Sequence, residues 1–477
     1  MSSPVAVSAP PLKPYQVILV VILASIGFLF DTYELLMFPL IGANAVKDLL
    51  HLPSVQDPEV AKWAGRMLWI AALCGGVFGL LGGWLIDRLG RKTIMVASIL
   101  LYSLSPVAAA FSTELWMLIL FRCTTFIGVC VELVAAVTWL AELFADKRTR
   151  EKVIAWTLAM ASLGGIMVTE VYKLIVAHAG DLPGMSVGGE PDVHAAWRYT
   201  LLTGLVPGLM ILLLLPFVPE SRVWAEKKRA GTLKRPSFRE LFGPGLLKTT
   251  LATTVLSACG YAAAFGALQM TPIQIAPGLP DIAAKRAALD AEEKEATTPA
   301  LKAELGKKKK AFADEVQDRR GDIQRWQEIG GLTGRILLAI LLMFVPSRTL
   351  IRLFLIPGIA LFPLTYLELV KGEYFLFAVA IFFCGLLTVA QFSYLSEFLP
   401  KVFPIHLRGT GGSFATNVGG RMIGTMAATL NTEVLSGLVP GATLPMKIAT
   451  GAAIIGGSVY LIALVASFFL PDPKAEE

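Results

Sequence analysis

The sequence predicts an all-α integral membrane protein. Its expected fold class is twelve transmembrane helices in two pseudo-symmetric six-helix halves, with a charged helical hairpin outside the membrane. The 477 residues are 55% hydrophobic and only 16% charged, whereas soluble domains carry about 25% charged residues. Apolar runs recur along almost the whole chain, each near the roughly 20 residues that a spanning helix needs. The longest expected cytoplasmic connection, near 219–247, leaves six runs on either side.

Each apolar run is an expected span, and the loops give the orientation. We expect spans at 16–40, 63–86, 93–112, 115–140, 152–177, 197–217, 248–272, 328–346, 350–370, 373–396, 409–431 and 448–470. Lys and Arg gather in the loops after spans 2, 4 and 6, and basic short loops mark the cytoplasmic side. We therefore expect an inner (plasma) membrane protein with both termini in the cytoplasm. This topology accounts for the net charge of +6 without a nucleic-acid partner.

These spans divide the chain into seven parts. They are a cytoplasmic tail at 1–15, the N-terminal half at 16–218, a cytoplasmic linker at 219–247, helix 7 at 248–275, an extracytoplasmic hairpin at 276–327, the other five helices at 328–470 and a cytoplasmic tail at 471–477. Residues 1–15 lack the pattern of a signal peptide, so we expect span 1 to be permanent.

The hairpin segment does not belong to the membrane by composition. Between 281 and 328 it has eleven basic and eleven acidic residues, and "TTP" interrupts it. This pattern is typical of two solvated helices around a proline turn. Two interpretations stay open, a hairpin that packs on its own membrane domain and a docking surface or gate cover.

The sequence contains no motif that predicts an enzyme. The five cysteines lie within expected spans without metal-site spacing, and buried free thiols act as small hydrophobic groups. The four histidines fall in loops or at span ends. We find no nucleophile elbow, phosphate-binding loop or metal motif, so we expect no enzyme activity, no cofactor and no metal.

The stretch "GGWLIDRLGRK", 82–92, is the most specific motif. It has the form G-x-L-x-D-R-x-G-R-K, with Gly83, Asp87, Arg88, Gly90 and Arg91 at fixed offsets. A basic loop explains the arginines but not the glycines and the aspartate. An acid at a helix end can cap a neighbouring helix or pair with basic residues, and such a lock must break when a gate opens.

Here the chain resembles the major facilitator superfamily, whose loop between spans 2 and 3 carries this motif. "VPESRVW", 218–224, is similar to the signature of its sugar-porter and organic-ion branch, without the second proline. Arg122 and Glu142 match that branch's R…G…E pattern in span 4, and "VFPIHLRGTG" is similar to the counterpart in the second half. The resemblance implies a gating role for the residues of these motifs: Gly83, Asp87, Arg88, Gly90, Arg91, Glu142, Arg148, Glu220, Arg222, Glu397 and Arg408.

Two acids, Asp31 and Glu34, stand in the second half of span 1. They are three residues apart and share a helical face. That face must be the bundle interior, because a charge in lipid costs at least about 2.5 kcal/mol. Desolvation favours the neutral form of a carboxylic acid, so such a group can load a proton on one side and release it on the other. The alternative is a structural acid paired to a neighbouring helix.

Glu132 in span 4 is the third candidate proton site. It lies ten residues after Arg122, about 15 Å along a helix, so the two cannot pair directly, and Lys173 or Arg421 are possible partners. Arg421 could hold a carboxylate or phosphate as a fork, or pair with an acid of span 1. The candidate substrate-binding residues are polar or aromatic side chains from several spans: Tyr33, Arg122, Trp139, Gln269, Asn417 and Arg421.

The first span, "FDTYELLMF", also resembles that of the sialate, phosphate and aromatic-acid proton symporters of the superfamily. Span 5, "MASLGGIMVTE", lacks the glycine-proline pair of its drug antiporters. We expect a monomer that moves a small organic anion or a sugar-like metabolite with protons by alternating access. The alternatives are efflux by solute/proton antiport, and a non-transporting receptor or scaffold with the hairpin as its docking arm.

Overall fold

The structure is a computed structural model. It describes residues 13–144, 153, 156–157, 160–214, 217, 220–221, 225–226, 238–296, 298–404 and 407–471. The expected gating residues Arg148 and Arg222 lie outside these ranges. For Gly83, Asp87, Glu397 and Arg408 the structure describes only the backbone.

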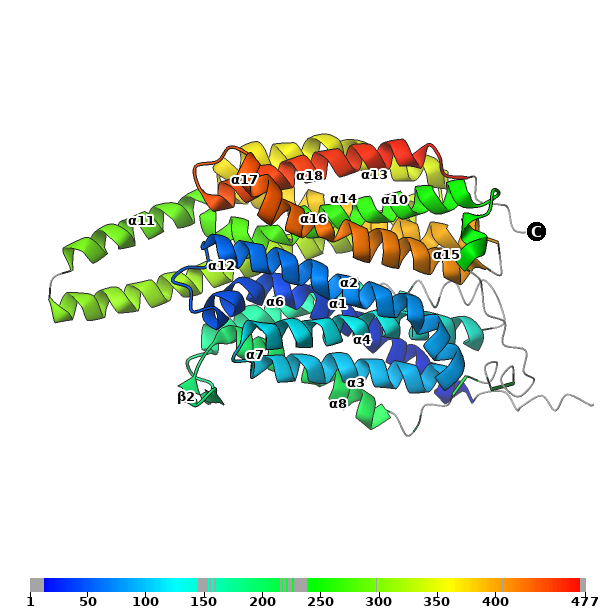
Figure 1. Cartoon of the computed structure of the whole chain (residues 1–477), viewed down its shortest axis with the longest axis horizontal. Coiled ribbons are helices and arrows are strands. Elements are labelled where there is room, and N and C mark those ends of the chain that lie inside the picture. The colour runs from blue at the N-terminus through cyan, green and yellow to red at the C-terminus, as the bar shows by residue number, and fades with distance from the viewer. Residues whose placement is uncertain are drawn as a thin grey trace, which may run out of the picture.

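The first bundle contains the helices from α1 to α8, drawn in blue to green (Figure 1). They are α1 (Pro14–Leu49), α2 (Pro58–Leu89), α3 (Arg91–Ala110), α4 (Leu115–Leu143), α6 (Ala161–His178), α7 (Ala196–Leu202) and α8 (Leu205–Leu214). Proline at the first position begins α2, and the Asp57 carboxylate caps it by accepting the Glu59 N–H at 2.9 Å. A two-stranded antiparallel hairpin, β1 (Met185–Val187) and β2 (Glu190–Val193), follows α6.

The second bundle lies beside the first (Figure 1). It contains η2 (Phe238–Phe242), α10 (Leu247–Ala263), η3 (Ala264–Leu268), η4 (Thr271–Ile275), η5 (Ala276–Gly278), α11 (Pro280–Glu295), α12 (Pro299–Leu341), α13 (Ser347–Pro363), η6 (Leu364–Glu368), η7 (Leu369–Lys371), α14 (Tyr374–Val402), α15 (Arg408–Phe414), η9 (Ala415–Gly424), α16 (Met426–Thr429), η10 (Leu430–Leu435), α17 (Ser436–Leu438) and α18 (Leu444–Ser467). The turns η3, η4, η6, η9 and η10 are π-helical. Such turns interrupt the regular helical hydrogen bonds and often mark functional positions.

Nine helical stretches of the described chain are long and apolar enough to cross a membrane. They coincide with nine of the twelve expected spans. The other three expected spans also contain helix, namely α6, the last part of α12 and the run from α15 to η10. The mostly helical fold is confirmed, and the number twelve stays a prediction.

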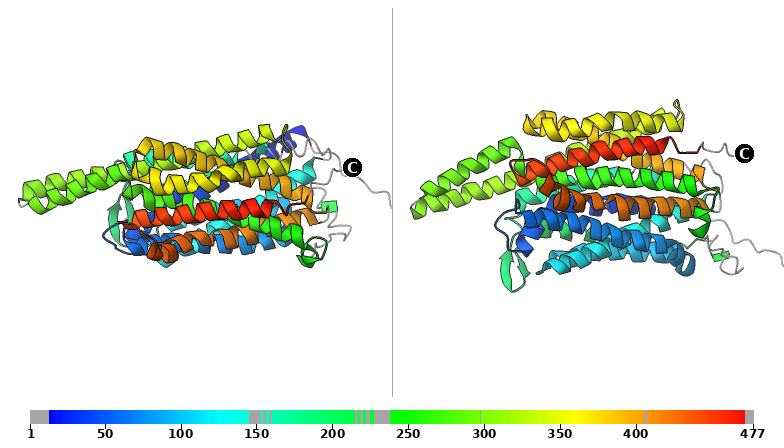
Figure 2. Two further views of the ribbon diagram at one scale, coloured as in Figure 1. Left: turned by 90° about the horizontal axis from the view of Figure 1, so that it is seen from above. Right: turned by 45° about the horizontal axis from the view of Figure 1, so that its top comes forward.

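Helices α11 and α12 extend beyond the bundles at one end of the molecule (Figures 1 and 2). We call this the hairpin end, and the opposite end, with α15 and η2, the linker end. Ion pairs tie the two arms together, with Lys285–Glu315 at 2.5 Å and Lys309–Glu293 at 2.6 Å. Helix α12 runs unbroken from Pro299 to Leu341, so the expected second arm and the expected eighth span are one helix.

Candidate functional site

A pair of buried acids lies at the centre of the first bundle. Asp31 of α1 is 8% exposed and Glu132 of α4 is fully buried, and the two carboxyl groups are electrostatic neighbours. Gly27 makes room for this approach, because a Cβ there would collide with Glu132 Oε1. Asp31 Oδ1 and both carboxyl oxygens of Glu132 are buried without a hydrogen-bond partner. Carboxylates only accept hydrogen bonds, so a bond between two carboxyl groups needs a proton on one of them. The arrangement can therefore hold one proton between α1 and α4.

A cation from the second bundle faces this pair. Arg421 of η9 is 7% exposed, and the groups that act on it electrostatically include Asp31 and Tyr261. Its Nη1 donates to Asn417 Oδ1 at 2.6 Å, and Asn417 Nδ2 donates to Ser413 Oγ at 3.1 Å. Within the described part of the chain, Arg421 forms no ion pair shorter than 4.0 Å. We call Asp31, Glu132, Asn417 and Arg421 the central cluster, and it spans both bundles.

Glu34 points away from the central cluster. Its Oε1 lies 2.6 Å from the position that a Cβ on Gly204 would take, close to Pro106 of α3. Neither carboxylate oxygen has a hydrogen-bond partner, and Arg122 is its electrostatic neighbour. Both acids of α1 are thus buried, but they face different neighbours.

Arg122 donates hydrogen bonds to backbone carbonyls of α1 near Pro39. Pro39 lies inside that helix and has no N–H to bond the carbonyl of Leu35, four residues earlier. Arg122 donates from Nη2 to Leu35 O at 3.1 Å and from Nη1 to Glu34 O at 2.8 Å. In a membrane helix such a freed carbonyl needs a partner from a neighbouring helix. This position gives Arg122 a structural role at the kink.

We expect Arg122→Ala to lower the free energy of unfolding by about 2–3 kcal/mol, since two hydrogen bonds from a charged donor are lost. In a Pro39→Ala background the loss should be smaller, because the new alanine can supply the missing N–H to Leu35. Thermal unfolding in detergent of the wild type, Arg122→Ala, Pro39→Ala and the double variant measures the coupling between residues 39 and 122. Equal losses in both backgrounds would contradict this role.

The other expected substrate residues lie in different surroundings. Tyr33 is 1% exposed and its hydroxyl bonds Thr203 Oγ1 at 2.6 Å, within the first bundle. Trp139 Nε1 and Gln269 Oε1 are buried without a hydrogen-bond partner. Only Asn417 and Arg421 of the six expected residues are brought together as one group with the acid pair.

The motif residues at the linker end form one network. Arg91 donates from Nε and Nη2 to the two oxygens of Glu142 at 3.0 and 2.8 Å. The Ser221 hydroxyl also donates to Glu142. Glu220 Oε1 accepts the N–H groups of Arg91 and Lys92 at 2.9 and 3.0 Å. Glu142 therefore joins Arg91 of the 82–92 motif, and not Arg122 at the other end of its own helix.

Glu220 is the N-terminal cap of α3. The residue before this helix is Gly90, which has no side chain and a φ of 103°, a conformation that favours glycine. We expect Glu220→Ala to lower the free energy of unfolding by about 1 kcal/mol, and Glu220→Gln, which keeps an acceptor, to lower it less. Thermal unfolding in detergent tests this, and equal effects of the two variants would exclude capping as the reason.

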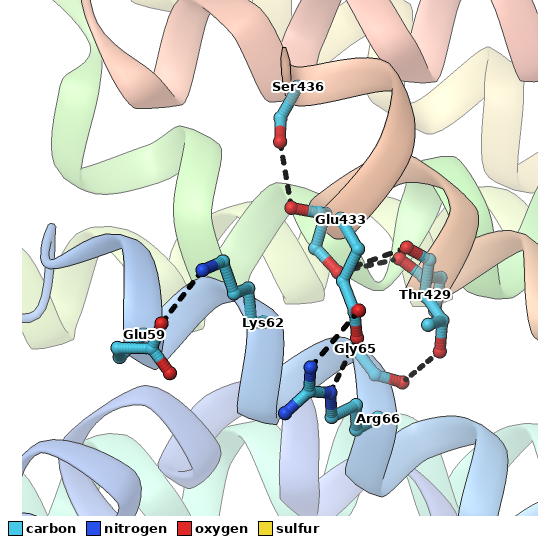
Figure 3. A network of polar contacts seen from close by, with 9 residues as sticks. Glu59, Lys62, Gly65, Arg66, Thr429, Glu433 and Ser436 are labelled. Atoms are coloured by element: carbon cyan, nitrogen blue, oxygen red, sulfur yellow. Dashed lines mark hydrogen bonds and ion pairs between the residues drawn. The ribbon is translucent and has the colours of Figure 1, made fainter.

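Two sets of ion pairs join the bundles toward the hairpin end. In the first clasp, Arg66 of α2 forms a double ion pair with Glu433 of η10 at 2.6 and 3.1 Å, and the Thr429 hydroxyl bonds Gly65 O at 3.2 Å (Figure 3). In the second clasp, α6 meets α12 through Glu170–Arg325 at 2.5 Å and Lys173–Asp322 at 2.5 Å. Opening this end requires both clasps to separate.

Sequence reasoning missed several buried polar residues. Tyr102 of α3 has an unpartnered hydroxyl and is an electrostatic neighbour of Asp31, Glu34 and Glu132. A tyrosine within an apolar run gives no signal that separates it from an interface anchor. Arg320 is fully buried, although the charge pattern places it in an exposed hairpin.

Across the described residues, no group of three or more His, Cys, Asp and Glu side chains could hold a metal ion. The polar groups of the central cluster are carboxyl, guanidinium and amide groups. They suit a proton and a small polar or anionic solute.

Comparisons of the sequence point to transporters. The family described as "Sugar (and other) transporter" matches residues 17–253. The arabinose-proton symporter of Bacillus subtilis is 29% identical over 213 residues, 44% of this chain and 42% of the relative. The 4-hydroxybenzoate transporter PcaK of Pseudomonas aeruginosa is 29% identical over 234 residues, 47% of this chain and 45% of the relative. The matches thus cover less than half of these relatives.

The fold is similar to solved structures over almost its whole length. The crystal structure of a D-xylose-proton symporter covers 96% of this chain and 99% of its own, with a TM-score of 0.64 and 16% identity. An inward open structure of the xylose transporter XylE from E. coli covers 96% and 98%, with a TM-score of 0.66 and 16% identity. The second bundle, which lies almost wholly beyond the family match, therefore has the fold of these structures as well.

Proposed function

We propose that the chain is a member of the sugar-porter branch of the major facilitator superfamily and carries a small organic anion or a sugar-like metabolite across the membrane together with protons. The anion is the preferred substrate. The linker end would face the cytoplasm and the hairpin end the outside, in an inner (plasma) membrane.

The central cluster carries this proposal. The acid pair Asp31–Glu132 belongs to the first bundle and Arg421 to the second, so the two signs of charge meet across the boundary at which the bundles must rock. When the pair is fully ionised, it attracts Arg421. When the pair takes up a proton, this attraction weakens, and the guanidinium becomes available to an anionic solute. Proton and anion then favour each other's binding, as coupling requires.

The clasps would form the gate toward the hairpin end. The clasps hold the bundles together toward the hairpin end, while the Arg91–Glu142–Glu220 network ties the elements of the first bundle at the linker end. A cycle would open one end at a time. The hairpin itself would then move with α12, because its second arm and the membrane part of α12 are one helix.

Uptake into proteoliposomes tests the proposal. Radiolabelled carboxylates and sugars are offered to the purified full chain, with and without an inward proton gradient. We expect accumulation of at least one of these solutes above its equilibrium level only when the gradient is present. Equilibration without accumulation would mean facilitated diffusion, and accumulation driven by an outward proton gradient would mean antiport.

A further inference from the structure

The inward face of α12 carries a polar stripe that the proposed proton coupling does not use. Arg320 and Gln324 are fully buried, Gln327 is 4% exposed and Glu328 is 7% exposed. Residues at i, i+4, i+7 and i+8 lie on one face of a helix. Gln327 Nε2 donates to Glu328 Oε1 at 3.1 Å, so the lower end of this stripe is internally bonded.

Arg320, at the end of the stripe nearer the hairpin, is a cation without a counter-ion among the described residues. Arg320 Nε and Nη1 have no hydrogen-bond partner, and Nη2 reaches only the carbonyl of Ile273, at 3.5 Å. The Tyr172 hydroxyl and a second cation, Arg286, are its electrostatic neighbours. Among the described residues no carboxylate lies within 4.0 Å of this guanidinium.

Arg319, the residue before Arg320 in α12, has a counter-ion. Arg319 forms an ion pair with Asp281 at 2.7 Å and lies over the ring of Tyr374 at 3.8 Å. Arg325, further along, pairs with Glu170. Arg320 differs from both by being fully buried and, within the described chain, unpaired.

Two buried glutamines with unpartnered amide atoms are adjacent to Arg320 or to its contact Ile273, along η4 or along α12. Gln274 follows Ile273 in η4, is fully buried, and has no partner on either its amide oxygen or its amide nitrogen. Gln324, one turn along α12, has an unpartnered Oε1. A guanidinium beside free amides offers donors to a carboxylate and both donors and acceptors to hydroxyl groups.

This group lies between the two bundles. Tyr172 comes from α6 in the first bundle, and Arg320 and Gln274 come from the second. Helix α6 approaches α12 closely at Gly321, where a Cβ would lie 2.7 Å from Lys173 Cγ. Lys173 in turn pairs with Asp318 at 3.0 Å and with Asp322 at 2.5 Å. The second clasp thus lies beside Arg320 along α12, with Asp318 on the hairpin side of it and Asp322 and Arg325 on the other side.

A buried charge without a partner is costly to desolvate, and ionisable residues of this kind in membrane proteins mark substrate or ion pathways. We propose that Arg320 binds the carboxylate of the transported solute, with Gln274 and Gln324 binding its hydroxyl groups, when the clasp opens. The inference rests on the proposed function and makes the substrate a hydroxylated carboxylate. Arg320 would be the first contact on the route from the hairpin end to the central cluster.

Ligand-induced thermal stabilisation of the full chain in detergent tests this. The probes are matched pairs with and without a carboxylate, D-galacturonate against D-galactose and D-gluconate against D-glucose. The variants are Arg320→Gln, Arg320→Lys and, as the matched control, Arg319→Gln. We expect the wild type and Arg319→Gln to bind a carboxylate probe at least about tenfold more tightly than its neutral counterpart. Arg320→Gln should lose this preference, and Arg320→Lys should keep part of it.

Unliganded stability separates this role from a structural one. Arg320→Gln removes an unpaired buried charge, so its melting temperature should not fall, whereas Arg319→Gln, which breaks an ion pair, should melt lower. A carboxylate preference that survives in Arg320→Gln, or a wild type that prefers the neutral sugars, would overturn the inference. The proposed function fails separately, if no probe accumulates in vesicles under a proton gradient while binding still depends on Arg320.

Discussion

Asp31→Asn should abolish proton-driven accumulation of the substrate while leaving exchange of substrate across the membrane intact. Asparagine keeps the size and hydrogen bonding of the side chain but takes up no proton in the physiological range. The variant resembles a permanently protonated Asp31, and it leaves Glu132 as the remaining acid of the pair. Because Arg421 is then less strongly attracted to α1, binding of the solute should persist.

The measurement compares two assays on one preparation of proteoliposomes. Gradient-driven uptake should fall by about 100-fold or more in Asp31→Asn, and counterflow of labelled substrate should stay within about threefold of the wild type. Glu34→Gln is the matched control, because Glu34 lies in the same helix but faces Gly204 and Arg122. A Glu34→Gln variant with the same defect would shift the coupling site to Glu34.

The first clasp should control which end of the molecule is open. Arg66→Glu places two acids where the Arg66–Glu433 double ion pair now joins α2 to η10 (Figure 3). The pair is partly exposed, with side-chain exposures of 35% and 26%, so its own contribution is about 1 kcal/mol or less. Like charges at this distance add repulsion. We therefore expect the equilibrium to move toward an open hairpin end by a factor of about five or more.

Spin labels at Lys62 of α2 and Ser436 of α17, in a background without the five native cysteines, report this opening. A longer-distance population should grow in Arg66→Glu and return to the wild-type level in the swap Arg66→Glu/Glu433→Arg. Added salt should reduce the effect of the single variant, because the charges are partly solvated. An unchanged distance distribution in Arg66→Glu would show that the clasp does not hold this end closed.

The sequence was sufficient for a mostly helical fold and for nine long apolar helices, because an apolar run of about 20 residues is rarely compatible with anything but a spanning helix. It also identified the 82–92 motif, since glycine and aspartate at fixed offsets carry information that a basic loop does not. It was not sufficient to show that α12 is continuous. A helix that leaves the membrane changes composition without changing its backbone, and the expected boundary at 328 followed the composition alone.

The central cluster was predictable in part. Asp31, Glu132, Asn417 and Arg421 were all candidates, because polar groups in apolar spans are costly and hence informative. Their arrangement was not predictable, since which helices face one another depends on tertiary packing. Arg122 illustrates the limit. It donates to two backbone carbonyls of α1 beside the proline kink, and no pattern of side chains predicts such a contact.

Substrate-induced proton movement is the most direct test of the central claim that the Asp31–Glu132 pair carries the coupled proton. Proteoliposomes with a pH-sensitive dye inside receive a substrate found in the uptake screen, with no initial proton gradient. The account predicts acidification of the lumen by the wild type and none by Asp31→Asn, although the variant still exchanges substrate. Equal acidification by both proteins would contradict it, because the proton would then cross without Asp31.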